Sequence, residues 1–322
     1  MVDVRPGTAI ALITEEIPAA LAGERLDRIV ALVTEASRSD AAELVEAGGV
    51  TVDGQPAPSG KVRLREGQIV VIDESLLPTV ELPVADPSIV VDVLYEDADI
   101  IVIDKPPGLV VHPGAGHPDG TLVNGLLALY PELAGIGESH RPGIVHRLDI
   151  GTSGLLVVAR SGDAYTGLVQ ALSAHRVERA YRTLVWGHPE NPVGVIDAPI
   201  GRDHRDPTRM GVVVDGRPAR TEYRVLRAFG EPAPAAALLC QLQTGRTHQI
   251  RVHLAAIGHP VVGDGTYGGI RDHIDSPRPF LHATALQLRH PITQQVMRFE
   301  SPLPADLLAV EATLTETTGD ET

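Results

Sequence analysis

The chain has 322 residues, of which 43% are apolar, and this length and composition suit two globular domains that each bury a core. Its 32 Gly and 26 Pro are too few for a low-complexity or collagen-like chain, and its single cysteine, Cys240, excludes an internal disulfide and a cysteine-bound metal cluster. No apolar run approaches the ~20 residues of a membrane-spanning helix, and the apolar residues 9–13 follow no basic leader, so we expect a cytoplasmic protein without a membrane partner.

The net charge of −15 hides an uneven distribution of charged residues. Residues 141–298 carry 19 arginines against 13 acidic residues, whereas the rest of the chain is acidic. Arginine presents a planar fork of donors that suits phosphate oxygens and base edges. The use of arginine can also reflect a general preference, because the chain has only two lysines, but the local excess of positive charge requires its own explanation.

Residues 1–82 are expected to form a small α+β domain. Apolar residues recur at helical spacing over 26–33, and an N-cap signal at 37–40 precedes a second helix. Strands are expected at 50–52 and 69–72, the first of them followed by an Asp-Gly hairpin turn.

A linker, a larger domain and a tail follow in our prediction. Prolines break regular structure in 83–88, which we interpret as the linker. Strand-like runs with few helices between them dominate 89–304, a pattern typical of an α+β domain with a mixed, mainly antiparallel sheet and flanking helices. The acidic residues 305–322 are predicted to be a disordered tail. The expected strands are 89–94, 100–103, 155–159, 181–186, 238–243 and 281–288, and the expected helices are 121–129, 164–173 and 247–256.

Residues 143–156 combine charged side chains with a glycine-rich turn. Arg147 and Asp149 lie two residues apart, so in an extended chain both side chains could project into one cleft. The spacing differs from that of a kinase catalytic loop and of a hydrolase nucleophile elbow, and the chain has no P-loop or dinucleotide-binding glycine motif. The histidines lack a metal-ligand pattern, and we interpret His248 and His253 as hydrogen-bonded structural groups on a helix.

Two further segments carry candidate functional residues. Residues 242–254 run from a strand through a glycine turn into a helix with Arg246 and Arg251, although a surface helix with solvated arginines would give the same pattern. Residues 179–186 place Tyr181 at the start of a strand, where a half-buried tyrosine at a sheet edge is the ordinary alternative.

Together these segments resemble the RluA family of pseudouridine synthases. The family patterns are His-Arg-Leu-Asp with Thr-Ser/Thr-Gly-Leu at 146–155, Lys/Arg-x-Tyr at 179–181, Gly-Arg-Thr/Ser-His-Gln-Ile/Leu-Arg-Val-His at 245–253, and flanking matches at 104–113 and 258–264. Asp104 departs from the family, since many relatives have Asn there. The resemblance covers nearly all of residues 90–300 and implies the pseudouridine synthase fold.

The first domain resembles the RNA-binding alpha-L motif of the ribosomal protein S-four type. The likeness rests on two short helices, Ser-Arg-Ser at 37–39, Gly-x-Val-x-Val-Asp-Gly at 48–54, Lys61, and Glu-Gly-Gln-Ile-Val-Val at 66–71. Residues 110–124 look most like the D-type members of the RluA family. This likeness implies large-subunit ribosomal RNA, or an assembling ribosomal particle, as the partner.

The family resemblance implies an isomerase that acts as a monomer on uridines in RNA, needs no metal or other cofactor, and uses Asp149, Tyr181 and Arg251 for catalysis. Asp149 would attack C1′ or remove the C2′ proton, and Arg251 would keep it ionised and oriented. Tyr181 would stack on the detached uracil, and Arg147 would occupy the space left by a flipped uridine. The other residues expected to bind RNA or shape the pocket are His146, Arg246, His248, Gln249, Ile250, Arg28, Arg38 and Lys61.

Several alternatives remain open. A group of arginines between the two main motifs could contact RNA or form a solvated loop: Arg202, Arg205, Arg209, Arg217 and Arg220. A ribosome-associated factor that binds RNA without turnover would also carry both domains, but it would have no need of the acid at 149. A glycosidase for free nucleosides would have no need of the first domain.

Overall fold

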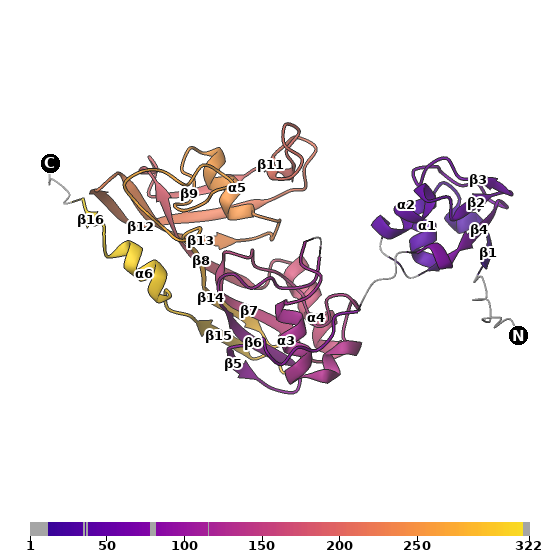
Figure 1. Cartoon of the computed structure of the whole chain (residues 1–322), viewed down its shortest axis with the longest axis horizontal. Coiled ribbons are helices and arrows are strands. Elements are labelled where there is room, and N and C mark those ends of the chain that lie inside the picture. Colours follow the sequence, from indigo (N-terminus) through magenta and orange to yellow (C-terminus); the bar gives the residue numbers. More distant parts are fainter. Residues whose placement is uncertain (1–11, 35, 37, 78–81, 115, 318–322) are drawn as a thin grey trace, which may run out of the picture. The chain divides into compact units, whose positions relative to one another are not determined.

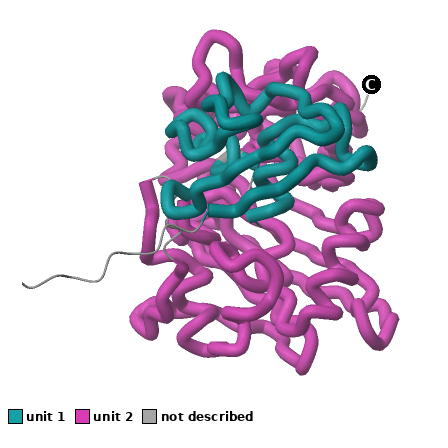
Figure 2. Tube along the Cα trace, turned by 90° about the vertical axis from the view of Figure 1, so that its right-hand side faces the viewer, with its two compact units in different colours: residues 1–81 teal, residues 82–322 magenta. Residues whose placement is uncertain are grey.

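The protein, seen here as a computed structural model, divides into two compact units, residues 1–81 and 82–322 (Figures 1 and 2). The division falls between residues 81 and 82. Among the helices that the structure describes, none has the length and apolar character that crossing a membrane requires. The described residues are 12–34, 36, 38–77, 82–114 and 116–317.

The smaller unit packs two helices against a four-stranded antiparallel sheet of order β1-β4-β2-β3. In α1, Leu26, Ile29 and Val30 recur at helical spacing and are buried, and they share a core with Val70 and Ile72 of β4. This confirms the small α+β domain, while the N-cap expected at Ser37 lies outside the described residues. The elements are β1 (Leu12–Glu16), α1 (Leu26–Val33), α2 (Arg38–Glu46), β2 (Val50–Val52), β3 (Gln55–Pro56) and β4 (Ile69–Asp73), with short 3-10 turns at Ala19–Leu21 and Glu74–Leu76.

A ten-stranded sheet forms the framework of the larger unit. Its main path is β16-β12-β13-β8-β14-β7-β6-β5, with β15 paired to β14 and β9 paired to β12. The β14–β7 pair is parallel and the other pairs are antiparallel, which confirms the α+β class and the mixed, mainly antiparallel sheet. The strands are β5 (Val93–Glu96), β6 (Ile100–Lys105), β7 (Ser153–Ala159), β8 (Glu178–Trp186), β9 (Val193–Asp197), β12 (Arg220–Glu231), β13 (Ala235–Leu242), β14 (Leu281–Arg289), β15 (Val296–Glu300) and β16 (Thr315–Glu316), beside a separate hairpin of β10 (Ile200–Arg202) and β11 (Met210–Val212).

Helices cover both faces of the sheet near β6 and β7. Ile101 and Ile103 of β6 share a core with α3, whereas the alternate residues Ile100 and Val102 share another with α4. A strand covered on both faces is apolar throughout, which explains why the sequence predicts β6 as a strand. The helices are α3 (Leu122–Leu129), α4 (Gly162–Ser173), α5 (Gln249–Ala256) and α6 (Ala305–Glu311), with a 3-10 turn at Pro131–Gly135.

The prediction of a disordered tail over 305–322 is wrong for residues 305–317. Residues 305–311 form α6, which buries Leu307 and Val310, and Thr315–Glu316 pairs with β12 as strand β16. Acidic residues of this segment pair with arginines of the sheet, because Glu311 binds both Arg182 and Arg227. The acidic composition that suggested a tail therefore serves ion pairs within the fold, and residues 318–322 lie outside the described part.

Part of the expected linker is attached to the larger unit. The side chain of Asn124 in α3 donates a hydrogen bond to the carbonyl of Val84 at 2.8 Å, and the backbone of Asn124 accepts one from Asp86 at 2.9 Å. The expected strand at 89–94 also begins late, since β5 covers Val93–Glu96. Proline removes backbone donors from residues 83–88, so these residues form no strand and are held by isolated bonds to Asn124.

Candidate active site

The motifs that match the RluA pattern meet at one cavity of about 330 Å³ in the larger unit. Asp149 reaches it from the turn before β7, a turn closed by the bond from Thr152 N to the carbonyl of Asp149 at 3.0 Å. Tyr181 comes from β8, and the turn before α5 supplies the opposite wall. Among the residues expected to form the site, those lining the cavity are His146, Arg147, Asp149, Tyr181, Arg246, His248, Gln249 and Ile250.

A chain of charges holds Asp149 in place. Nη1 of Arg251 donates to Oδ2 of Asp149 at 3.1 Å. The other edge of the same guanidinium makes two bonds to Asp264, from Nε at 2.6 Å and from Nη2 at 2.9 Å. The side chains are 15% exposed for Asp149, 8% for Arg251 and 0% for Asp264, so the carboxylate that faces the cavity is anchored by a buried pair. Two-point bonding of this kind fixes the guanidinium plane as well as its position.

Asp264 is itself held by its own turn. Its Oδ1 accepts bonds from the backbone amides of Thr266 at 2.9 Å and Tyr267 at 3.2 Å. The guanidinium of Arg251 also lies over the ring of Tyr267, 5.1 Å from its centre. Burial would lower the pKa of Arg251, but the hydrogen bonds and charges of Asp264 and Asp149 outweigh it and raise that pKa, so Arg251 stays charged.

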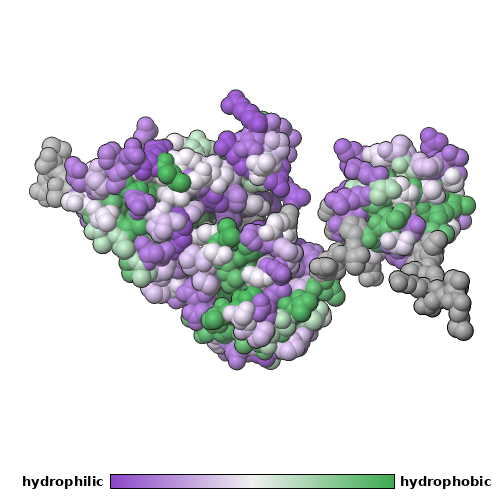
Figure 3. All heavy atoms as spheres, in the orientation of Figure 1, coloured by the Kyte–Doolittle hydropathy of each residue, from purple (hydrophilic) through white to green (hydrophobic). Residues whose placement is uncertain are grey.

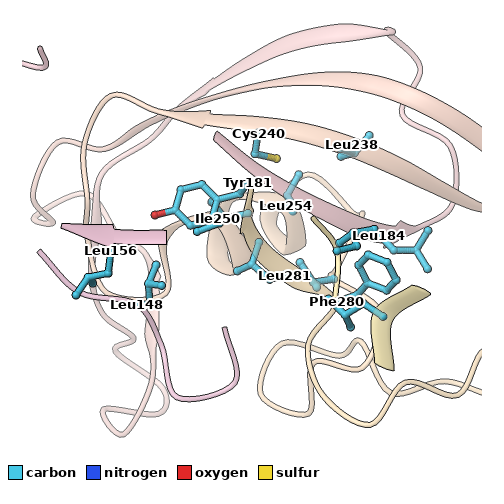
Figure 4. Close-up of a cluster of buried hydrophobic side chains, with 14 of the residues drawn as sticks. Leu148, Leu156, Tyr181, Leu184, Leu238, Cys240, Ile250, Leu254, Phe280 and Leu281 are labelled. Atoms are coloured by element: carbon cyan, nitrogen blue, oxygen red, sulfur yellow. The ribbon is translucent and has the colours of Figure 1, made fainter. Parts of the chain in front are cut away.

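Tyr181 lies among apolar side chains and is only 4% exposed (Figure 4). It packs with Cys240 of β13, Ile250 of α5 and Leu281 of β14, and its ring edge lines the cavity. Burial raises the pKa of the phenol, so it is protonated at neutral pH. The structure thus gives Tyr181 a deep position beside Asp149, not the half-buried place at a sheet edge that was its alternative.

Arg147 stands at the exposed rim of the same cavity. Its Nη1 lies 3.4 Å from Nε2 of His112, whose ring also lines the cavity. No carboxylate among the described residues pairs with Arg147. An exposed guanidinium on a short turn beside an open cavity is available to an incoming ligand.

His146 sits behind Arg147, and its ring faces the sheet. Its Nε2 accepts a bond from the backbone amide of Val157 in β7 at 3.2 Å, which places the ring hydrogen on Nδ1. That Nδ1 is buried and has no hydrogen-bond partner among the described residues. Burial, helped by the charge of Arg179, lowers the pKa of His146 to about 3, so its imidazole is neutral in the folded protein.

We expect this neutral histidine to weaken the fold in acid. The unfolded chain takes up a proton on His146 below its ordinary pKa of 6.5, and the folded protein does so only near 3, so the free energy of unfolding falls as pH is lowered between these values. The slope for one such group is at most ~1.4 kcal/mol per pH unit. In His146→Gln, the amide oxygen can accept the bond from Val157 and cannot titrate, so urea unfolding measured from pH 7 to 4 should show a shallower loss.

A slope in His146→Gln equal to that of the wild type would contradict this assignment. Other histidines add their own acid sensitivity, so the variant should reduce the slope without abolishing it. Those with a lowered pKa, chiefly through burial, are His112, His248, His253 and His282.

The turn before α5 is shaped by Gln249, whose amide is fully used inside the protein. Its oxygen accepts from Thr244 Oγ1 at 2.7 Å and from the amide of Arg246 at 3.0 Å, and its nitrogen donates to Arg220 O and Thr221 Oγ1, both at 3.0 Å. Gln249 therefore positions the turn, and its amide has no free group for a ligand. Substrate contacts by this amide were expected, and its internal bonds argue against them.

His248 and Ile250 flank this glutamine on the cavity wall. His248 adopts the left-handed conformation with φ 57°, and its Nδ1 lies 2.9 Å from the hydroxyl of Tyr267. Ile250 is 4% exposed and gives the cavity an apolar wall. His253 is a structural group, as expected, since it contacts Thr221 Oγ1 and the carbonyl of Ala198.

The smaller unit carries the three remaining candidates. Arg28 pairs with Glu24 at 2.7 Å and Arg38 with Asp27 at 3.2 Å, and both arginine side chains are more than half exposed. Lys61 is exposed and forms no ion pair within the described residues. Arg28 and Arg38 line one groove beside α1, whereas Lys61 lies on the loop whose Gly60 binds the backbone of Asp27.

The arginine-rich loop of the larger unit is the β10–β11 hairpin and the chain after it, and this projecting segment is strongly hydrophilic (Figure 3). Two of its candidates are ion-paired, since Arg209 binds Asp203 and Arg220 binds Asp197. Arg202 and Arg217 instead line a groove that shares Arg246 with the main cavity. The net excess of arginine in 141–298 overstates the free positive charge, because some of these arginines pair with acidic residues outside that range, as Arg141 does with Glu138 and Arg278 with Asp306.

A different acidic group, Asp97, Asp99 and His290, could hold a cation by geometry. The carboxylate of Asp97 is already engaged by the hydroxyl of Tyr95, the amides of Asp99 and Ile100, and His290. These internal bonds account for the cluster.

Sequence reasoning missed three side chains of the site. Asp264 and Tyr267 anchor Arg251, and Arg179 lines the cavity wall beside Tyr181. Asp264 ends one of the flanking stretches that match the RluA pattern, and Arg179 begins the Lys/Arg-x-Tyr pattern at 179–181, so both carried a signal. Their roles depend on burial and on contacts between distant segments, which spacing alone does not give.

Comparisons with known proteins agree with this geometry. The family described as RNA pseudouridylate synthase matches residues 99–256, and the S4 domain matches residues 24–70. The chain is 50% identical over 295 residues to an "Uncharacterized RNA pseudouridine synthase" of Chloroflexus aurantiacus, covering 91% of each chain. It is 44% identical over 312 residues to "Ribosomal large subunit pseudouridine synthase D" of Pseudomonas aeruginosa, covering 91% of this chain and 92% of the relative.

A solved structure shares the fold of the larger unit. "Human RNA Pseudouridylate Synthase Domain Containing 1" matches with a TM-score of 0.57 and 29% identity, over 72% of this chain and 91% of the human one. The fold and these matches define an RNA pseudouridine synthase. The chain belongs to the RluA family of these enzymes and carries an N-terminal S4 domain.

Proposed function

We propose that the protein converts specific uridines of large-subunit ribosomal RNA to pseudouridine, with Asp149 acting on the ribose. The observation that carries the chemistry is the chain Asp149–Arg251–Asp264 beside Tyr181 in one cavity. The substrate class is supported by the likeness to the relatives of Pseudomonas aeruginosa and Xanthomonas campestris named "Ribosomal large subunit pseudouridine synthase D".

The reaction is an isomerisation with no redox change. The N1–C1′ bond breaks and its electron pair leaves with the uracil; the base turns, C5 bonds to C1′, the C5 proton is lost and N1 gains a proton. Asp149 has two possible roles. Its carboxylate either bonds to C1′ and is later displaced by C5, or takes the C2′ proton and returns it. Both roles need an ionised carboxylate with one free oxygen, which the single bond from Arg251 leaves available.

Arg251 and Tyr181 have complementary tasks in this proposal. The permanently charged Arg251 orients the carboxylate of Asp149, while Asp264 keeps the guanidinium from turning away. Tyr181 lies deep in the cavity as a protonated phenol, so its ring can stack on the detached uracil and its hydroxyl can assist loss of the C5 proton. Ile250, which is 4% exposed, gives the same place an apolar wall.

The target nucleotide must leave its stack to reach Asp149. Unstacking a base costs a few kcal/mol, and a side chain that fills the vacated space reduces this. Arg147 suits that role because it is exposed at the rim and has no acidic partner among the described residues. Arg246 and His248 line the wall beyond it, where phosphate or base contacts are expected.

We expect Arg147→Ala to lower the single-turnover rate at saturating RNA by at least tenfold, because flipping becomes harder. Arg205→Ala, which removes an exposed arginine of the β10–β11 hairpin, should instead leave that rate unchanged and weaken binding, with a salt slope smaller by about one phosphate. Equal effects of the two variants on affinity, with normal rates in both, would reduce Arg147 to an ordinary phosphate contact.

The S4 domain is proposed to deliver the RNA through Arg28, Arg38 and Lys61. Residues 82–322 form their own compact unit with the whole cavity in it, so the fragment without residues 1–81 should keep its single-turnover rate at saturating RNA within about threefold. Its RNA affinity should fall by at least tenfold. A collapse of the saturating rate in a folded fragment would mean that the first unit completes the active site.

The test of the proposed function uses purified protein and transcripts of large- and small-subunit ribosomal RNA. Pseudouridine, measured by nuclease digestion and mass spectrometry, should form only in the large-subunit RNA, without added nucleotide and with EDTA present once the RNA has folded in monovalent salt. Formation only in small-subunit RNA would refute the substrate class. Loss of activity with EDTA that a divalent ion restores through the protein would refute the metal-free reaction.

A further inference from the structure

One buried arginine of the cavity has no ion-pair partner among the described residues. Arg179 is the second residue of β8 and lies two residues before Tyr181, so both side chains point to the same face of the sheet, and both line the cavity. Arg179 is 7% exposed. Among the described residues no carboxylate pairs with it, and its buried Nε lacks a hydrogen-bond partner.

The end of this side chain reaches the turn before α5. A Cβ added at Gly245, in the turn before α5, would lie 2.8 Å from Nη1 of Arg179. The charge of Arg179 is also felt on both sides, since it acts on His146 and on Tyr181 in the direction that lowers their pKa values. Arg179 is 7% exposed, whereas Arg147 is exposed at the rim, so Arg179 lies deeper in the cavity and its charge acts on the buried phenol of Tyr181.

A buried charge without a counter-charge destabilises the folded protein. Removing an arginine from water without a counter-charge is unfavourable, and native proteins ordinarily pair such groups. The other arginine of the site shows the contrast, because Arg251 is satisfied by Asp264 and Asp149. Arg179 is thus available to bind a negatively charged group of a ligand.

We propose that Arg179 is a further catalytic residue, which binds the uracil through its carbonyl oxygens and stabilises the negative charge that the base carries after the N1–C1′ bond breaks. The inference rests on the proposed function and adds a role for a residue outside the Asp149 group. When that bond breaks, the electron pair of N1 spreads onto the neighbouring carbonyls, and donors fixed in advance in a site closed to water stabilise such charge strongly.

The depth of Arg179 favours the base over a phosphate. A phosphodiester is joined to two nucleotides and stays near the rim, whereas a flipped uracil enters the cavity edge-first and stacks on Tyr181. The guanidinium offers parallel donors, which match N1 and O2 of the uracil, two adjacent acceptors once the N1–C1′ bond has broken.

The experiment compares Arg179→Met, Arg179→Lys and a matched control, Arg298→Met, which removes an exposed arginine of β15. Single-turnover rates at saturating RNA, RNA affinity with its salt dependence, and the unfolding temperature are measured for each. Arg179→Met should lower the saturating rate by about 10²–10³-fold, as expected for loss of a fixed donor to developing charge. Arg179→Lys should recover at least tenfold of this, and the control should behave as wild type.

Two further readouts separate this role from others. The RNA affinity of Arg179→Met should stay within about threefold of wild type, and the salt slope should be unchanged. The variant should unfold at the same or a higher temperature, because an unpaired buried charge has been removed. A normal rate with weaker binding and a smaller salt slope would assign Arg179 to a phosphate instead. A fall of several degrees in the unfolding temperature, with no recovery in the lysine variant, would make its role structural.

The wild-type protein serves as the test of the function on which this inference rests. If it forms pseudouridine and Arg179→Met forms it equally fast, the inference fails alone. If the wild type forms none in any ribosomal RNA, both the proposed function and this inference fail.

Discussion

Asp149→Asn should lower pseudouridine formation by at least ~10³-fold while RNA affinity stays within about tenfold. The amide keeps the size of the carboxylate and can still accept the bond from Arg251, but it can neither attack C1′ nor take the C2′ proton. The loss should appear in the single-turnover rate at saturating RNA, because the change removes the reacting oxygen and leaves the rim and the S4 domain intact.

The control for this variant is Asp163→Asn, which removes an exposed carboxylate from the first turn of α4. It changes the net charge equally and should retain the wild-type rate. A rate in Asp149→Asn above a few per cent of wild type would contradict the assignment of the reacting acid. A loss of RNA affinity beyond tenfold would show that Asp149 organises the binding surface.

Arg251→Met should both stop catalysis and destabilise the larger unit by about 3–5 kcal/mol, the range for breaking a buried ion pair by removing one partner. The reason is Asp264, which is fully buried and would keep its charge with only backbone amides to bind it. Asp149 would lose its orienting bond in the same step. Urea unfolding measures the first effect and single-turnover kinetics the second.

The double variant Arg251→Met/Asp264→Asn separates these two effects. Removing the stranded charge should recover a large part of the lost stability, because the pair no longer leaves an ion buried. Catalysis should stay low, since nothing then orients Asp149. An Arg251→Met protein that unfolds within about 1 kcal/mol of wild type would contradict the anchoring role of Asp264.

The central strands could be predicted from sequence because their surroundings make them apolar. All seven residues of β7 are buried, so the run needed no knowledge of its neighbours to be recognised. Strand β12 was missed because Arg224 and Arg227 interrupt its apolar pattern and the register shifts between Val225 and Arg227. Helix α6 was missed because its acidic residues find arginine partners far away in the sequence.

The candidate site could be predicted only as a set of residues. The motifs brought Asp149, Tyr181 and Arg251 forward, and the fold places the first two on one cavity with Arg251 bound behind Asp149. The second carboxylate of the anchor, Asp264, and the unpaired state of Arg179 are properties of burial and of distant contacts. Neither the anchoring by Asp264 nor the lack of a partner for Arg179 can be predicted from a single sequence.

We propose above that this protein makes pseudouridine in large-subunit ribosomal RNA with Asp149. The most direct measurement maps pseudouridines at single-nucleotide resolution in the ribosomal RNA of cells that lack the protein and carry either wild type or Asp149→Asn. Specific pseudouridines of the large-subunit RNA should vanish on deletion, return with the wild type and stay absent with Asp149→Asn. An unchanged large-subunit map on deletion, or full restoration by Asp149→Asn, would contradict this proposal.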